Sequence, residues 1–221
     1  MKTAKSYFLY ALLALILAWN PLLPAQSAPA PDAKAQAEEW TGMFTQAQTL
    51  WEQEAPEDAL NLAAMAMQFA EESFGVDSPR TIESIHLVAG YLVEFEAYDH
   101  AEPQFRKALA ASKKVYGDEH EKTLTLTADL ADMYGYAGDR ETATAMYEAA
   151  LETMRRVLPP DHRLTLLSIN TLNDLYYAAG RLKEAEALLL GDLEKYEALF
   201  GSNDPDVLTA TENLAQNYRQ R

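Results

Sequence analysis

The fold is decided by residues 123–158, which read TLTLTADLADMYGYAGDRETATAMYEAALETMRRVL. Apolar residues recur at helical spacing as far as Ala137, Gly138-Asp139 interrupts them, and a second helical pattern follows almost at once. A glycine placed directly after a helix supplies the left-handed backbone conformation that ends it. This stretch therefore predicts two helices joined by a tight turn, which together form a helical hairpin.

The same pattern recurs along the chain at a fixed interval of 42 residues, the spacing between Ala101 and Ala143. Matching residues fall into four columns: Ala59, Ala101, Ala143 and Ala185; Leu92, Tyr134, Tyr176 and Tyr218; Phe105, Tyr147 and Leu189; and Leu109, Leu151 and Leu193. The loops between units share one Gly or Pro position, at Gly75, Gly117, Pro159 and Gly201. A long period of this kind is typical of repeat arrays, in which each unit buries its apolar face against its neighbours.

The repeats predict an all-α domain over residues 35–221. Its helix pairs are expected at about 35–74, 79–116, 121–158 and 163–200, followed by a single capping helix at 205–219. That last helix contains Asn213, Gln216, Asn217, Arg219 and Gln220, a polar composition suited to the end of an array.

Residues 1–27 predict a secretory signal peptide. Lys2 and Lys5 precede an uncharged run from Tyr7 to Trp19, and small residues, Ala25 and Ser27, stand before the expected cleavage point. A run of about 13 residues is short for a membrane span of roughly 20. We expect cleavage after Ser27, a mobile leader over residues 28–34, and export of the mature chain. The periplasm is the favoured destination and the extracellular space the alternative.

Composition excludes several kinds of function. The formal net charge of −16 argues against nucleic acid or an anionic membrane surface as partner. The chain has no Cys, no Gly-rich phosphate loop and no Gly-x-Ser-x-Gly motif. Of the four histidines, His120 and His162 lie one repeat apart in equivalent loops, so repetition explains them better than metal binding. The sequence therefore predicts no catalysis, no metal and no cofactor.

The repeats resemble the tetratricopeptide repeat family. The large and small residues that match its pattern are Leu130, Ala131, Tyr134, Ala143, Tyr147 and Ala150. The usual unit of that family has about 34 residues, and the longer spacing here is similar to the repeats of kinesin light chain and related bacterial proteins. The loops at 117–123 and 160–165 and the turn at 180–186 support that likeness. The first pair departs from the pattern, since it lacks a Gly at its turn and has Trp40 and Trp51 instead.

The resemblance implies a right-handed α-solenoid of antiparallel helix pairs that binds other proteins. In this family the first helix of each pair lines a concave groove, and matching positions give a candidate partner-binding groove. Its predicted residues are Glu83, His86, Glu94, Asp132, Tyr136, Asn170, Asp174, Tyr177 and Glu212.

Acidic and aromatic side chains dominate this set, and aromatic residues often provide the main binding contacts. The expected partner is a protein or peptide, with a basic or polar segment and an apolar anchor. One alternative is a generic interaction surface without charge specificity. Another is a self-associating structural component of a cell-envelope assembly.

Overall fold

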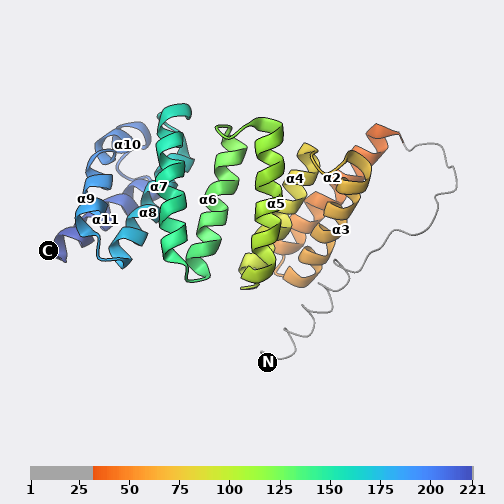
Figure 1. Cartoon of the computed structure of the whole chain (residues 1–221), viewed down its shortest axis with the longest axis horizontal. Coiled ribbons are helices and arrows are strands. Elements are labelled where there is room, and N and C mark those ends of the chain that lie inside the picture. The colour runs from red at the N-terminus through yellow and green to blue at the C-terminus, as the bar shows by residue number, and fades with distance from the viewer. Residues whose placement is uncertain (1–31, 221) are drawn as a thin grey trace, which may run out of the picture. The chain divides into compact units, whose positions relative to one another are not determined.

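The computed structural model describes residues 32–220, so the predicted signal peptide and the first four residues of the predicted leader lie outside the described residues. The described chain consists of helices joined by short turns (Figure 1). The helices are α2 (Ala33–Glu52), α3 (Pro56–Phe74), α4 (Pro79–Glu94), α5 (Tyr98–Tyr116), α6 (Glu121–Tyr136), α7 (Arg140–Val157), α8 (Arg163–Ala178), α9 (Leu182–Leu190), α10 (Leu193–Phe200) and α11 (Pro205–Arg219). Since α2 begins at Ala33, the last two residues of the predicted leader are helical.

The chain divides into two compact units, one that ends at Leu92 and one that begins at Val93. In the first unit, α2 and α3 pack as a hairpin. Trp40 of α2 is buried, packs with Ala66 and Ala70 of α3, and donates its indole N–H to Ser84 Oγ of α4 at 2.8 Å. A buried indole needs a partner for its N–H, and Ser84 supplies it. The tryptophan therefore links α2, α3 and α4.

The second unit continues the pairwise packing from α5 to α11. Helices α5, α6 and α7 lie side by side (Figure 1), α8 packs on α7 and α9, and α11 packs on α8, α9 and α10. The predicted columns form its core: Ala143 and Ala185 are fully buried, and Tyr147 and Leu189 nearly so. The prediction of an all-α repeat fold with helices paired in sequence is confirmed.

One helix differs from its predicted form. The second helix of the fourth pair is interrupted at Gly191-Asp192, which separates α9 from α10. The equivalent position one repeat earlier, Ala149, lies inside the continuous helix α7. Glycine is a poor helix former, and the backbone N–H of Asp192 bonds Leu189 O, three residues back, at 3.2 Å. The Asp192 carboxylate is also paired with Arg155 of α7, which holds the break against the neighbouring helix.

The four hairpin turns share a left-handed residue at one repeat position. It is Glu54 (φ 60°), Glu96 (φ 58°), Gly138 (φ 93°) and Gly180 (φ 72°), and in all four the backbone N–H bonds the carbonyl three residues before. Glycine adopts this conformation readily, whereas a residue with a side chain meets a steric cost. Glycine thus marks this position in the third and fourth pairs, whereas a glutamate takes the left-handed conformation in the first two.

This position can be tested within the second unit. We expect Glu96→Gly to stabilise the protein by about 0.5–1 kcal/mol, because relief of the steric cost exceeds the added entropy of the unfolded chain. The reverse change, Gly138→Glu, is expected to destabilise by about 1–2 kcal/mol. A Cβ at Gly138 would meet nothing within 4 Å, so the loss would come from the backbone. Urea unfolding followed by circular dichroism measures both, and equal stabilities would contradict this account of the turns.

Candidate protein-interaction surface

The predicted groove residues lie on the first helices of the pairs and on α11, and they fall in both units. Glu83 and His86 belong to α4 in the first unit, where both are half-buried. Those of the second unit are Glu94 at the end of α4, Asp132 and Tyr136 of α6, Asn170, Asp174 and Tyr177 of α8, and Glu212 of α11. We call six of these second-unit residues the A-helix surface, because most of them lie on the first (A) helix of a pair. They are Glu94, Asp132, Tyr136, Asp174, Tyr177 and Glu212.

Asp132 is half-buried, and its side chain is hydrogen-bonded to the second helix of its own helix pair. The Tyr147 hydroxyl of α7 hydrogen-bonds the Asp132 carboxylate, and it also interacts with Thr171 of α8. Burial raises the pKa of Asp132, as does nearby Asp129, while the bond from Tyr147 acts in the opposite direction. Burial and the Asp132 charge together raise the pKa of Tyr147. Asp132 is therefore a structural acceptor as well as a surface charge.

Tyr136 is the most exposed large apolar side chain among the described residues, at 66%. Partial burial of its hydroxyl is the main reason why the pKa of Tyr136 is raised. The charges of Asp132 and Glu94, and the nearby Tyr98, raise it further. The structure thus brings together three predicted residues from α4 and α6: an exposed aromatic ring and two carboxylates. This group can contact an apolar side chain and a cation at the same time.

The amide side chains between α8 and α11 form a ladder of hydrogen bonds. Asn170 Nδ2 donates to Asp206 O at 3.0 Å, Asn213 Nδ2 to Asp174 Oδ1 at 3.0 Å, and Asn217 Nδ2 to Asn173 Oδ1 at 2.9 Å.

Asn170 is only 7% exposed, so the structure corrects its predicted role: it braces two helices and offers little to a partner. Asp174 remains exposed and keeps its place in the A-helix surface. Burial of the carboxyl raises the pKa of Asp174, while the hydrogen bonds from Asn173 and Asn213 act in the opposite direction. Sequence reasoning missed Asn173 and Asn217 as structural residues. The residues one repeat earlier, Ala131 and Leu175, are apolar. An amide at a position that is apolar in the preceding repeat was the sequence signal that could have identified Asn173 and Asn217.

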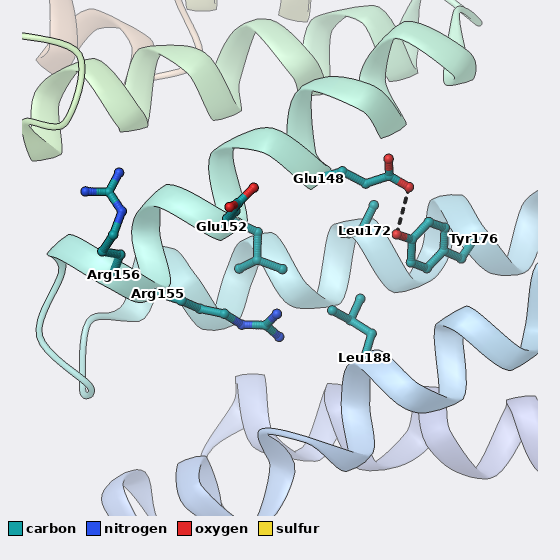
Figure 2. Close-up of a pocket in the computed structure, with 8 residues that line it drawn as sticks. Glu148, Glu152, Arg155, Arg156, Leu172, Tyr176 and Leu188 are labelled. Carbon is teal, nitrogen blue, oxygen red and sulfur yellow. Dashed lines mark hydrogen bonds between the residues drawn. The ribbon is translucent and has the colours of Figure 1, made fainter.

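A pocket of about 520 Å³ lies between α7, α8 and α9 (Figure 2). Its lining residues are Glu148, Leu151, Glu152, Arg155, Arg156, Leu172, Tyr176 and Leu188. The Tyr176 hydroxyl donates to Glu148 Oε1 at 2.8 Å, and Arg181 binds the same oxygen at 3.0 Å. Most of the lining comes from second helices, which the groove prediction did not consider.

Both pocket arginines are already paired, Arg155 with Asp192 and Arg156 with Glu119 at 2.8 Å. Their charges are therefore partly satisfied by the protein itself. The pocket has an apolar floor and paired charges at its rim, and nothing in it points to a particular ligand.

Metal and membrane features are not found in the part of the chain that the structure describes. Residues 32–220 contain no group of three or more His, Cys, Asp or Glu side chains placed to hold a metal ion. Over the same range, every helix is too short or too polar to cross a membrane.

Comparison with known proteins agrees with a repeat scaffold. The tetratricopeptide repeat family matches residues 40–114, 98–156 and 129–190, which together span 40–190. The chain therefore belongs to the tetratricopeptide repeat family. This fold is generally a protein-interaction scaffold and is typically non-catalytic. The comparison with curated proteins gave no significant match.

Solved structures share the fold at low sequence identity. BtubC (BKLC) from P. vanneervenii has a TM-score of 0.74 at 20% identity, covering 98% of this chain and 81% of that one. A Podosopora anserina protein of kinesin-light-chain type, with nearly identical TPR-like repeats, has a TM-score of 0.72 at 20% identity, covering 82% and 86%. The apo form of RapI gives 0.63 at 17% identity, covering 84% and 52%. The kinesin-light-chain likeness of the repeats is thus confirmed as a likeness of fold.

The amide ladder makes a stability prediction. Asn217→Leu gives the residue found at the equivalent position 175, but it leaves the buried Asn173 Oδ1 without the donor that Asn217 supplies. We expect a loss of about 1–3 kcal/mol. Adding Asn173→Ala, the residue at equivalent position 131, should recover part of that loss. Urea unfolding of the two variants measures the difference, and a double variant less stable than Asn217→Leu would contradict the pairing.

Asp132 makes a pH prediction. Its raised pKa means that the folded state binds this proton more tightly than the unfolded state. The resulting stabilisation is fully present below the unfolded pKa of about 3.9 and is lost as the pH rises through the higher folded pKa.

Above the folded pKa the ionised carboxylate therefore weakens the fold relative to a neutral side chain of the same shape. We expect Asp132→Asn to raise the Tm at pH 7, with a gain that disappears toward pH 3.5. Glu152→Gln, at an exposed position of α7, is the control and should change little. A gain that is constant with pH would contradict ionisation of Asp132 as the cause.

Proposed function

We propose that this chain is an exported adaptor that binds a protein or peptide through its A-helix surface and has no catalytic activity of its own. The observation that supports this proposal best is the exposed Tyr136 ring beside Asp132 and Glu94. Tyrosine is common where the binding energy of a protein interface concentrates, and charged side chains beside it can add specificity.

The partner chemistry follows from the charges on this surface. Asp132, Asp174, Glu94 and Glu212 are all acidic, and the protein as a whole has a net charge of −16. A basic segment would be attracted by these carboxylates, while an apolar side chain beside it would contact Tyr136 or Tyr177. The preferred ligand is therefore a segment with Lys or Arg next to an apolar residue.

Export is proposed from the signal-peptide pattern of residues 1–27, and the periplasm is the favoured location. The partner would accordingly be a protein of the cell envelope. An extracellular partner is the alternative.

The test reverses charges that the fold does not use. Glu94→Lys with Glu212→Lys changes two exposed carboxylates of the A-helix surface, and Tyr136→Ala removes the exposed ring. The matched control, Glu141→Lys with Glu152→Lys, makes the same charge change on exposed positions of α7. Envelope proteins retained by the unmodified protein would be identified, and their affinities for all variants measured by calorimetry.

We expect the A-helix variant to lose at least about tenfold in affinity, and the control to lose little. Binding should also weaken as salt rises from about 0.05 to 0.3 M, because exposed charges are screened within about 10 Å at 0.1 M. A partner lost in the α7 control but kept by the A-helix variant would place binding on the second helices and contradict the proposal.

A further inference from the structure

Two carboxylates of the A-helix surface are hydrogen-bonded by polar side chains of other helices. Asp132 of α6 accepts a bond from the Tyr147 hydroxyl of α7. Asp174 of α8 accepts one from Asn213 Nδ2 of α11 at 3.0 Å. Among residues 32–220, no Lys or Arg pairs with either carboxylate. Because a carboxylate can accept several hydrogen bonds, each of them can still bind a cation that a partner supplies.

Tyr147 brings a hydroxyl into a buried column that is otherwise apolar. The residues one repeat before and one repeat after it are Phe105 and Leu189, and all three side chains are at most 2% exposed. Apolar side chains therefore fill this position as well as tyrosine does. A buried hydroxyl costs free energy unless it is hydrogen-bonded, so its presence is explained by what it bonds. It bonds Asp132, and it also interacts with Thr171 of α8.

The hydroxyl occurs in a pair whose first helix has an aspartate to hold. In the third pair the two positions are Asp132 and Tyr147. In the second pair the same two positions are Gly90 and Phe105, so the carboxylate and the hydroxyl are both absent there. In these two pairs the polar groups occur together or not at all. This correspondence indicates that the hydroxyl in the core serves the carboxylate at the surface.

The fourth pair supplies the donor from a different helix. Its aspartate is Asp174, and its residue in the buried column is Leu189, which has no donor. Asn213 of α11 donates to Asp174 instead. Asn213 stands one repeat after Thr171, the residue that interacts with the Tyr147 hydroxyl. Each aspartate of the A-helix surface therefore has a donor held by a neighbouring helix, whichever residue the core column contains.

We propose that Tyr147 and Asn213 are positioning residues of the A-helix surface, each of which holds one aspartate in place for the cation of a bound segment. This inference rests on the proposed function, in which these carboxylates attract a basic segment. A side chain that is already held loses less rotational freedom on binding, so its contact with the partner is stronger. The hydrogen bond also favours the charged form of the carboxylate, and only the charged form attracts a cation.

The pH dependence of binding follows from the groups around Asp132. The titratable groups that act on Asp132, or on the Tyr136 ring beside it, come from four helices and are Glu94 of α4, Tyr98 of α5, Asp129 of α6 and Tyr147 of α7. Burial and Asp129 raise the pKa of Asp132, whereas the bond from Tyr147 lowers it. Loss of the hydroxyl should therefore raise this pKa further, and cation binding should then fail at a higher pH.

Tyr147→Phe tests the first bond in the free protein. Phenylalanine already fills the equivalent position 105, so the variant is expected to fold. NMR titration of the full chain, labelled at its aspartate carboxyl carbons, gives the pKa of Asp132, and Asp132→Asn assigns the signal. We expect Tyr147→Phe to raise this pKa by about 0.5–1 unit. Tyr176→Phe is the matched control, because it removes a hydroxyl bonded to Glu148, outside the A-helix surface (Figure 2), and it should leave the pKa unchanged.

A defined probe measures the effect on binding: a capped peptide with one lysine between two leucines. Its affinity for the full chain is measured over the pH range in which Asp132 titrates. We expect Tyr147→Phe to weaken binding by about two- to tenfold, and to move the acid limit of binding upward with the pKa of Asp132. In the Asp132→Asn background the same change should cost nothing more, because the group that Tyr147 holds is already altered.

The same scheme applies to the second bond. Asn213→Ala should raise the pKa of Asp174 and weaken peptide binding, and it should have no further effect on binding in the Asp174→Asn background. The pKa of Asp132 should stay the same in this variant, because Tyr147 remains in place.

An unchanged Asp132 pKa in Tyr147→Phe would overturn the inference, as would unchanged peptide affinity at every pH. A loss of affinity that persists in the Asp132→Asn background would also overturn it, since Tyr147 would then act through packing alone. Failure of the proposed function gives a different result. The peptide would then not bind the unmodified protein, or would bind Tyr136→Ala equally well, while the pKa of Asp132 in the free protein would still respond to Tyr147→Phe.

Discussion

The rest of the structure depends on the fact that a helical hairpin cannot bury its apolar face by itself. Each pair needs the next pair as its covering layer, and the interval of 42 residues returns the same side chains to each junction. Small residues stand where helices approach most closely, as with the fully buried Ala143 and Ala185, and a large residue such as Tyr147 fills the space beside them. This constraint explains the regularity of the second unit.

The apolar columns make the contacts between successive repeats similar to one another, and polar side chains make each of these contacts different. The Tyr134 hydroxyl donates to Glu102 at 2.7 Å, whereas that of Tyr176 donates to Glu148, with Arg181 completing the group. The α8–α11 junction uses amides instead. Half-exposed pairs of this kind contribute little to stability, but each fits only one neighbour. They are therefore well suited to fixing the order and register of similar helices.

The sequence predicted the helices well because three independent signals coincide at each boundary: apolar periodicity, a turn residue and the repeat interval. It failed where only one signal was available. Gly191 interrupts a helix that the repeat pattern predicts to be continuous, and Glu96 adopts a conformation that glycine usually marks.

The site was less predictable than the fold. Positions transferred from the family identify which helix face a residue occupies, but they do not show whether its side chain is already bonded. Asn170 was assigned to the surface and is buried, because its partner is a backbone carbonyl of α11 that no sequence pattern reveals. The α7–α9 pocket was missed because side chains of three helices line it, and their placement depends on tertiary packing.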